Sequence, residues 1–506
     1  MLGFALRMQH LTDPPFDFHP VRQFHSVVIA HWLYVEGLPT VPAWEAEIAR
    51  LNSDDEPFLE PPIIELLATT GYRLLGAEQL GVPRVLSSLF WVIGGVFLYL
   101  LARQMSSETE ALTASTIYLF LPFGVQASRS FQPDPLMVML LIAALWAMVR
   151  WDASRSRGRL GLAIALAAAA IFAKPSSAFL VYAAFGALTI HRFGARRLVL
   201  QREIYVFGLL SLLPILVYSA DGYFVSGFLR GQEEGRFLPQ LLLTRSFWTG
   251  WAARVNETVG YVPYLVALGG GLLLTAGIRR ALLLGLWVGY AILCLFFTYN
   301  TPTHSYYHLP LLPIVALSLS PLAGPRLRNR RWRRSGIACL IALWLISVGI
   351  SIRQLDSSQQ GQQIAVAREI GERLSHSTRT LFLAESFGLP LRYYGELSGA
   401  SWPSTSELTL EALEGRAMTV QERFDAFGRS LRPDFFVVTR FDMFREQPDL
   451  RAYLDRFPVF ADTVQYLIFD LRHTAVEEPE LRGVPTSAGL ATGGTVTPVI
   501  QTDMRE

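Results

Sequence analysis

Residues 85–101, VLSSLFWVIGGVFLYLL, form a run without a single charged side chain. A helix needs about 20 apolar residues to cross the hydrocarbon core of a bilayer, and this run approaches that length. Similar runs recur along the chain and predict further spans at about residues 110–126, 134–151, 160–173, 175–190, 204–220, 258–276, 281–298, 307–323 and 335–352. With a short apolar segment at residues 1–11, we expect an all-α polytopic membrane protein with about eleven transmembrane helices.

The composition supports this fold class. Of the 506 residues, 51% are hydrophobic and 17% are charged, whereas about 25% of the residues in a soluble domain are charged. The net charge of +2 gives no reason to expect a nucleic-acid partner. Cys294 and Cys339 both lie in apolar runs, so we predict unpaired thiols and neither a disulfide framework nor a zinc site.

The arginines indicate the orientation in the membrane. If the amino terminus is cytoplasmic, alternate loops carry Arg103; Arg150, Arg155, Arg157 and Arg159; Arg192, Arg196, Arg197 and Arg202; Arg279 and Arg280; and Arg326, Arg328, Arg330, Arg331, Arg333 and Arg334. The opposite short loops carry almost no cations, as the positive-inside rule requires. We therefore expect a multi-pass protein of the cell membrane with loops 12–84 and 221–257, and everything after residue 355, on the outer face.

A polar stretch at residues 12–31, TDPPFDFHPVRQFHSVVIAH, interrupts the apolar pattern. It combines Asp13 and Asp17 with His19, His25 and Arg22, and its prolines prevent a regular helix before residue 21. A rigid polar loop at the end of a span suits a reaction on a lipid-borne substrate. A solvated loop with incidental charges is the alternative interpretation.

Lys174 is the only lysine in the chain and lies between two apolar runs, just before Pro175. A charge at the membrane edge is costly and often functional, and an ammonium group suits a phosphate. A snorkelling interfacial cation is the alternative. Asp134 opens another span, either as a helix cap or as a second functional carboxylate.

A turn with the sequence THSYYH, residues 303–308, precedes a Leu-Pro-rich span. His304 and His308 are four residues apart and share a helix face if the helix begins early, which suits a metal pair. An interfacial aromatic belt that includes Tyr306 and Tyr307 is the favoured alternative, and we predict no metal site.

The composition changes after residue 355. Residues 364–374 and 449–457 have helical patterns, whereas residues 380–386, 434–439 and 466–471 have strand patterns, which together predict a small α/β domain over residues 356–475. We interpret this domain as an accessory or acceptor-recognition module. Residues 476–506 are rich in Gly, Thr, Pro and Glu, which predicts a disordered tail. The expected order is therefore a transmembrane domain at 1–355, the α/β domain at 356–475 and this tail.

Several of these motifs share an order with a known family. The chain resembles the C-type membrane glycosyltransferases that use polyprenyl-phosphate sugars, in particular the protein mannosyltransferase and aminoarabinose transferase family. The residues that carry the resemblance are Asp17 to Arg22, Glu60-Pro61-Pro62-Ile63, Pro133-Asp134-Pro135-Leu136, Lys174-Pro175 and His304-Ser305-Tyr306-Tyr307-His308-Leu309-Pro310. The chain departs from the family where Asp-Phe-His-Pro replaces adjacent Asp-Glu and where Glu60 replaces a basic residue.

The resemblance implies an enzyme that moves a sugar from a polyprenyl-phosphate donor to an acceptor hydroxyl on a lipid, glycan or protein, with inversion. It implies Asp17 and Asp134 as catalytic carboxylates, and Arg22, Lys174, Tyr306 and Tyr307 at the donor phosphate. His19, His304 and His308 are additional candidates. A carboxylate can accept the acceptor's proton, and cations stabilise the departing phosphate. The polyprenyl-phosphate sugar is the expected donor substrate and the bilayer is the expected surroundings. A divalent metal is an open alternative that no strong motif supports.

Two other classes of protein are alternatives to this enzyme. A secondary transporter would show inverted repeats and charged or broken helices near the bilayer midplane, and the sequence shows no repeat. A non-catalytic receptor or scaffold built around the outer α/β domain would not require Asp17, Arg22 and Lys174 to converge.

Overall fold

The computed structural model describes residues 1–473 with the exception of 57, 59, 231–236, 324–329, 357–360 and 414. It divides into two compact units, Met1–Gln363 and Ile364–Glu506. The predicted tail 476–506 lies outside the described residues, as does the side chain of Cys339, whereas Cys294 is a buried free thiol.

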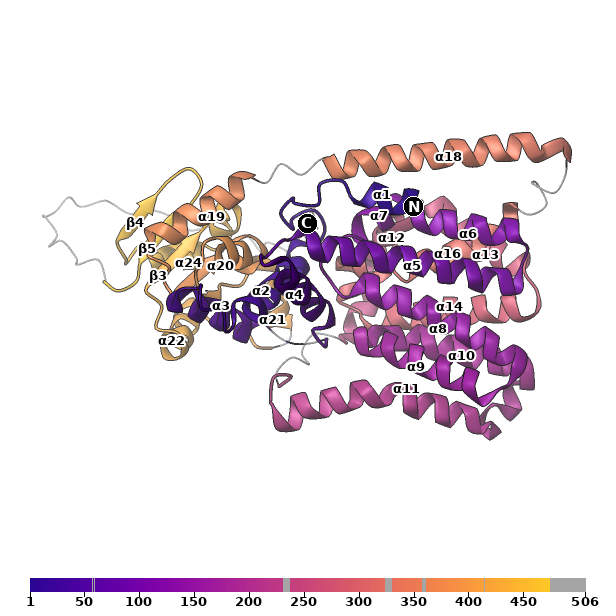
Figure 1. The fold of residues 1–506 in the computed structure, drawn as a ribbon. Helices are drawn as coiled ribbons and strands as arrows, with labels where there is room; N and C mark the ends of the chain where they lie inside the picture. Colours follow the sequence, from indigo (N-terminus) through magenta and orange to yellow (C-terminus); the bar gives the residue numbers. More distant parts are fainter. Residues whose placement is uncertain are drawn as a thin grey trace, which may run out of the picture. The chain divides into compact units, whose positions relative to one another are not determined.

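The first unit is a bundle of helices (Figure 1). Its α-helices are α1 (Leu2–Arg7), α2 (Pro20–Val35), α3 (Ala43–Asp55), α4 (Ile63–Leu75), α5 (Gly81–Met105), α6 (Glu108–Phe120), α7 (Pro122–Ala127), α8 (Asp134–Ser154), α9 (Arg157–Ala173), α10 (Ala178–Phe193), α11 (Arg202–Ala220), α12 (Arg245–Val259), α13 (Tyr261–Leu273), α14 (Gly277–Phe296), α15 (Asn300–Thr303), α16 (Leu311–Leu319) and α18 (Arg330–Asp356).

Every apolar run predicted as a span contains helix, although not always one continuous helix. The run at 110–126 is divided between α6 and α7 because Pro122 cannot continue the hydrogen bonding of α6. Within the described residues, four helical segments are long and apolar enough to cross a membrane alone: Gly81–Met105, Asp134–Ser154, Arg202–Val225 and Gly277–Phe296. Tyr261–Leu273 and Ile341–Leu355 are shorter apolar segments, so the count of eleven spans stays a prediction.

Small residues allow the helices of the bundle to approach closely. A Cβ on Gly285 of α14 would lie 2.6 Å from the carbonyl oxygen of Ala183 in α10, and one on Gly289 would lie 2.8 Å from that of Phe179. This spacing of small residues one turn apart is typical of packed membrane helices. The α10–α14 contact therefore depends on the absence of these side chains.

The segment between the first polar loop and α5 forms the helices α3 and α4. α4 buries Glu65 and Thr69 while Leu66 and Leu74 are 51% and 84% exposed. Ile64, Ala68 and Tyr72 are buried beside these two polar residues, so a mixed face packs into the protein while leucines on the other face are exposed. This arrangement suits a helix at the membrane surface.

The second unit is a mixed five-stranded sheet covered by helices. Its strands are β1 (Thr380–Leu383), β2 (Gly399–Ser401), β3 (Phe435–Val438), β4 (Val459–Asp462) and β5 (Leu467–Asp470), in the order β2-β1-β3-β5-β4. β1 pairs in parallel with β2 and β3, whereas β5 is antiparallel to β3 and β4. Its α-helices are α19 (Gly361–Arg373), α20 (Leu389–Tyr394), α21 (Thr405–Leu413), α22 (Val420–Ser430), α23 (Phe441–Arg445) and α24 (Pro448–Leu454).

The predicted helices and strands of this unit are confirmed, while β2, β4 and α20–α23 were not predicted. β1 and β3 are buried along their whole length because apolar clusters cover both faces of the sheet. One cluster contains Phe382 and Ile370 of α19, and the other contains Phe436 and Phe424 of α22.

Candidate active site

Asp17 lies in the loop before α2 and is held by Arg84 of α5. The Nη1 of Arg84 donates to Oδ2 of Asp17 at 2.7 Å, and its Nη2 donates to Oδ1 at 3.0 Å. Burial raises the pKa of the Asp17 carboxyl, but the charge and hydrogen bonds of Arg84 outweigh this effect, so the net pKa is below its ordinary value. Asp17 is therefore an ionised carboxylate held in a fixed orientation.

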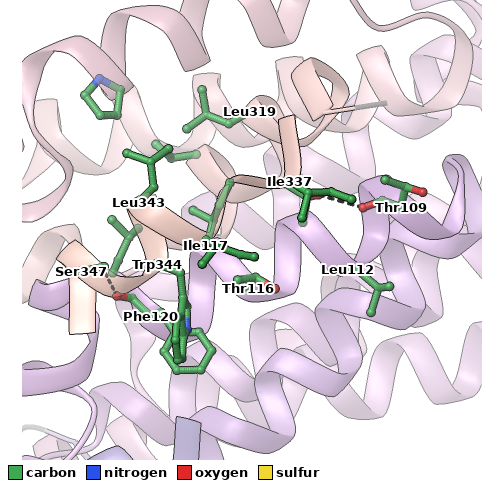
Figure 2. Close-up of a pocket in the computed structure, with 15 residues that line it drawn as sticks. Thr109, Leu112, Thr116, Ile117, Phe120, Leu319, Ile337, Leu343, Trp344 and Ser347 are labelled. Carbon is green, nitrogen blue, oxygen red and sulfur yellow. Dashed lines mark hydrogen bonds between the residues drawn. The ribbon is translucent and has the colours of Figure 1, made fainter. Parts of the chain in front are cut away.

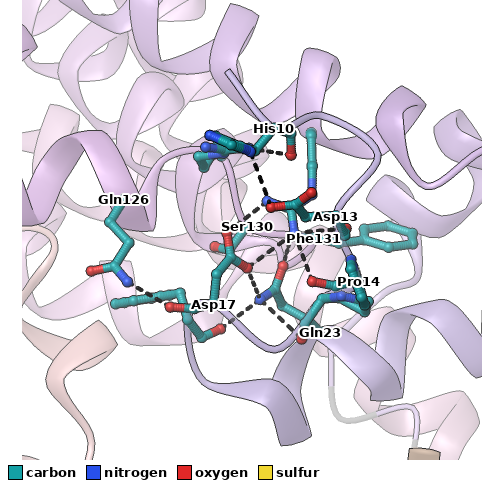
Figure 3. Close-up of polar contacts among 12 residues, drawn as sticks. His10, Asp13, Pro14, Asp17, Gln23, Gln126, Ser130 and Phe131 are labelled. Carbon is teal, nitrogen blue, oxygen red and sulfur yellow. Dashed lines mark hydrogen bonds and ion pairs between the residues drawn. The ribbon is translucent and has the colours of Figure 1, made fainter. Parts of the chain in front are cut away.

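Gln23 ties the same loop to the start of α8 (Figure 3). Its amide nitrogen donates to the carboxylate of Asp17 at 3.1 Å and to the carbonyl oxygen of Phe18 at 2.7 Å. Its amide oxygen accepts from the backbone N–H of Phe131 at 3.1 Å. Gln126 of α7 donates to the carbonyl oxygen of Asp17 at 2.5 Å. The predicted rigid polar loop is thus fixed by side-chain hydrogen bonds in addition to its prolines.

A second cluster alternates cations and carboxylates. Lys174 Nζ donates to both carboxylate oxygens of Asp134 at 2.9 Å and lies 4.0 Å from Glu60, and Arg22 Nη2 donates to Glu60 at 3.0 Å. The side chains of Lys174 and Asp134 are only 4% and 1% exposed. Glu60 therefore lies between the two cations. The charges alternate in the order Asp134, Lys174, Glu60 and Arg22.

Glu60 stays ionised in this cluster. Burial raises the pKa of its carboxyl, but Arg22 and Lys174 lower it by more, to about 2. Tyr218 of α11 fixes the backbone beside it by donating to the carbonyl oxygen of Phe58 at 2.8 Å. An acidic residue thus stands where the family has a basic one, between two cations that neutralise it.

Tyr306, in the turn Ser305–His308, touches both cations and both neighbouring histidines. Lys174 Nζ lies 4.7 Å from its ring centroid, and the Arg22 guanidinium lies 5.8 Å away. The ring also makes edge contacts with His19 at 4.8 Å and His304 at 5.4 Å between centroids. Tyr307 joins the same group, since Lys174 Nζ is 5.2 Å from its ring.

His19 and His304 stack at 6.2 Å between ring centroids and are both uncharged at neutral pH. Burial, followed by nearby cations, lowers the pKa of His19 to about 3 and that of His304 to about 4. His19 is hydrogen bonded to the hydroxyl of Ser305 at 2.8 Å, and it directly precedes α2 in the left-handed conformation, with φ of 46°. Neutral imidazoles can donate one hydrogen bond each without adding charge.

Arg254 of α12 is a cation of this site that the sequence did not reveal. Its charge contributes to the lowered pKa of both His19 and His304, as does that of Arg22. The Nε atoms of Arg254 and Arg22 are buried and have no hydrogen-bond partner among the described residues. Unused guanidinium donors beside neutral imidazoles form an environment suited to an anion.

The other histidines do not converge on a metal site. His308 is fully buried and hydrogen bonded to the Tyr290 hydroxyl at 2.6 Å and the Thr301 carbonyl oxygen at 2.9 Å. His25 pairs with Glu56 at 2.6 Å, and His31 pairs with Glu78 at 2.7 Å. Within the described part of the chain, no group of three His, Cys, Asp or Glu side chains is placed to hold a metal ion.

The structure thus brings most of the predicted site residues into one contact network. Arg22, Lys174, Tyr306, Tyr307 and Asp134 share direct contacts, and His19 and His304 join them through Tyr306. Asp17 is two residues from His19 but bonds with Arg84 and Gln23 instead. Arg84, Gln23 and Arg254 were not predicted. Arg84 is far in sequence from Asp17, and Arg254 is far in sequence from His19 and His304.

An apolar cavity of about 600 Å³ lies in the same unit, between α6, α13, α16 and α18 (Figure 2). Its walls are hydrocarbon or aromatic side chains apart from the hydroxyls of three threonines of α6 and Ser347. The α6 residues that line it extend from Thr109 to Phe120, and Leu121 follows. At 1.5 Å per residue, this stretch measures about 18 Å, a large part of the bilayer core.

One known protein family matches about a third of the chain. Residues 59–219 match the family described as dolichyl-phosphate-mannose-protein mannosyltransferase. This third of the chain is similar to that mannosyltransferase family. The matched segment contains Glu60, Asp134 and Lys174 of the charge cluster. This result confirms the family resemblance and disagrees with the transporter and receptor alternatives.

Solved structures of glycosyltransferases share the fold. ArnT from Cupriavidus metallidurans in the apo state gives a TM-score of 0.56 at 15% identity, covering 92% of this chain and 95% of that one. ArnT bound to undecaprenyl phosphate gives 0.55 at 16%, with 92% and 96% covered. The oligosaccharyltransferase AglB from Archaeoglobus fulgidus, with an inhibitory peptide and a dolichol-phosphate, gives 0.50 at 12%, covering 94% and 74%. A comparison with curated protein sequences gives no match.

Proposed function

We propose that this glycosyltransferase moves a sugar from a polyprenyl-phosphate donor to an acceptor hydroxyl at the outer face of the membrane. The observation that carries the proposal is the network around Tyr306, where Arg22 and Arg254 have unused buried donors beside two neutral histidines. The protein with the same fold that was solved with undecaprenyl phosphate supports a lipid phosphate as the donor class.

The phosphate of the donor is held by Arg22 and Arg254, with His19 and His304 as neutral donors. Lys174 lies over the rings of Tyr306 and Tyr307 at the edge of the same site. Its hydrogen bonds to Asp134 limit its direct contact with the phosphate. As the sugar leaves, the phosphate gains charge, and fixed donors in a site of low polarity stabilise that charge. His308 supports this turn through Tyr290 and does not contact the donor.

Asp17 is the proposed base. Its lowered pKa makes it a weak base, but it stays ionised and accepts a hydrogen bond from the acceptor hydroxyl. The acceptor oxygen bonds to the anomeric carbon as the bond from that carbon to the phosphate oxygen breaks. The hydroxyl proton passes to Asp17 late in this step, and the lipid phosphate departs on the opposite face, so the configuration inverts. Asp134 remains an ionised partner of Lys174 and a secondary candidate.

The isoprenoid chain of the donor has a suitable environment in the cavity between α6 and α18. An isoprenoid chain makes only dispersion and hydrophobic contacts, which the apolar walls supply. The acceptor is a lipid, a glycan or a protein.

The topology belongs to the same proposal. About eleven spans, with an outer active site and an outer module over residues 356–475, place the reaction away from cytoplasmic nucleotide sugars. A phosphatase or fluorescent reporter fused after residue 473 should behave as extracytoplasmic. Cytoplasmic behaviour of that fusion would remove the outer-face assignment.

Lipid analysis of cells tests the proposed donor. Cells that lack the protein should accumulate a polyprenyl-phosphate sugar, and the wild-type gene should return it to its normal level. The Asp17→Asn variant, expressed and inserted to the same level as the wild type, should leave the polyprenyl-phosphate sugar accumulated. An unchanged pool of sugar-phosphate lipids in the deficient cells would contradict the proposal.

A further inference from the structure

The sheet unit contains an open hollow of about 440 Å³ that the transfer reaction does not use. It lies beyond the end of the sheet at which β1 and β3 begin and β5 ends. At this end, Thr380 pairs with Phe435, and Phe435 pairs with Asp470. The loop 375–379 forms one wall, and Asp434, Phe435, Phe460 and Arg472 form the other.

Three arginines line this hollow, and neighbouring carboxylates hold each one. Arg379 donates from Nε and Nη2 to Asp434 at 3.0 and 2.7 Å, and Arg472 donates from the same two atoms to Asp470 at 2.8 and 2.7 Å. Arg373 uses only Nε, toward Glu369 at 3.0 Å. Among the described residues, the remaining guanidinium N–H groups of these arginines have no protein acceptor.

The arginines are both orientated and accessible. Their side chains are 49%, 50% and 46% exposed for Arg373, Arg379 and Arg472. A guanidinium that is held through one edge presents its other N–H groups in a fixed plane, which matches the two oxygens of a carboxylate or phosphate. Within the lining, Asp434 is the only acid beside these three cations.

Hydroxyl groups and an aromatic ring complete the surface. The loop presents Ser375, Ser377 and Thr378, and both Ser375 and His376 adopt left-handed backbone conformations with φ of 49° and 55°. Such consecutive non-glycine positions persist only when the surrounding structure enforces them. The Phe460 side chain is 44% exposed at the rim. Fixed arginines, hydroxyls and an open ring together match the polar edges and apolar face of a sugar.

We propose that this hollow binds an acidic glycan, through a carboxylate or phosphate group on the arginines and a sugar ring on Phe460. Neutral glycans lose the charged contacts, and free inorganic anions lack the ring contact. The claim concerns binding by the sheet unit alone and holds whether or not the transfer reaction is as proposed above.

Calorimetric titration of the purified full-length protein in detergent tests the claim with three probes. These are trigalacturonate, its neutral methyl ester and inorganic phosphate. Trigalacturonate should bind at least about tenfold more tightly than the ester, because charge-assisted hydrogen bonds are each worth about one decade or more in affinity. Inorganic phosphate should bind more weakly than trigalacturonate.

Variants locate the binding in the hollow. The double variant Arg379→Gln with Arg472→Gln should weaken trigalacturonate binding about tenfold or more, and Phe460→Ala should weaken it several-fold. Arg440→Gln is the matched control, because Arg440 also pairs with an acid, Asp442, but follows the opposite end of β3. Asp17→Asn should bind normally, which separates this claim from the proposed transfer.

Equal affinity for the acid and its ester would overturn the proposal, and so would undiminished binding by the double variant. Competition by inorganic phosphate at the same concentration as trigalacturonate would assign the hollow to free anions instead. If the double variant melts below the wild type, Phe460→Ala decides the question, because it removes an exposed ring and leaves every ion pair in place.

Discussion

Asp17 and Arg84 form a buried ion pair, so a structural role and a catalytic role must be separated. Removing one partner leaves the other charge buried and unpaired, which costs about 3–5 kcal/mol, whereas removing both is far less harmful. Arg84 donates a hydrogen bond to each carboxylate oxygen of Asp17. Single and double substitutions of this pair can therefore separate the two roles.

We expect Asp17→Asn to reduce transfer at least about a hundredfold, since an amide cannot take the proton from the acceptor. Arg84→Gln alone should lower the melting temperature. The double variant Asp17→Asn with Arg84→Gln should recover much of the stability but none of the activity. Activity in the double variant would reduce Asp17 to a structural residue. The measurement is transfer rate alongside melting temperature in detergent.

Lys174 and Asp134 form the second pair of this kind. Lys174→Met leaves the Asp134 carboxylate buried without its two hydrogen bonds, so we expect lower yield and a lower melting temperature. Lys174→Met with Asp134→Leu should recover stability. The single variant could instead melt at the wild-type temperature and only require more donor for the same rate. That result would mean that Lys174 contacts the phosphate directly and that the ion pair contributes little to stability.

His19 predicts a specific dependence of stability on pH. The unfolded histidine titrates near 6.5 and the folded one near 3, so between these values the unfolded chain binds more protons. The stability contributed by neutral His19 is complete above pH 6.5 and is lost as the pH falls toward 3. The loss reaches about 2 kcal/mol at pH 5.

The matched variant is His19→Asn, because asparagine tolerates the left-handed conformation that His19 adopts. Melting temperatures of the wild type should fall more steeply between pH 7.5 and 5 than those of the variant. Parallel curves for the two proteins would show that folding does not lower the pKa of His19.

At the scale of elements, the close contact of α10 with α14 offers a sharp test. Gly285→Ala places a Cβ 2.6 Å from the Ala183 carbonyl oxygen, so the helices must separate and the melting temperature should fall by several degrees. Gly186→Ala on α10 is the control, because no atom lies within 4 Å of its added Cβ. Equal melting temperatures for both variants would mean that these helices do not pack as described.

The helices and the main strands were predictable because hydropathy and alternation are local properties of the sequence. Lys174 and Tyr306 were also found locally, one by its singularity and the other by its motif. Arg84 and Arg254 could not be found in this way, since each looks like any helical arginine until the fold sets it beside Asp17 or His304. Glu60 was noted as a departure from the family pattern, but only the structure showed that it bridges Arg22 and Lys174.

At the scale of the whole molecule, the helical unit combines fixed carboxylates, unused guanidinium donors and a long apolar cavity. The charged groups suit a phosphate, and the apolar cavity suits a lipid chain. A lipid phosphate that carries a sugar is a single ligand with both of these parts. The family match over residues 59–219 agrees with a transferase, and a direct assay can identify the donor.

The most direct test is transfer by the purified protein in liposomes supplied with a radiolabelled polyprenyl-phosphate sugar and a membrane extract as the acceptor source. We expect label to move from the donor lipid to a new product with the wild type and with Arg440→Gln. Asp17→Asn should give no product, and Arg254→Gln should need about tenfold or more donor for the same rate, because one charge-assisted contact to phosphate is lost. Normal donor dependence in Arg254→Gln, or transfer from a nucleotide sugar in place of the lipid, would contradict the account.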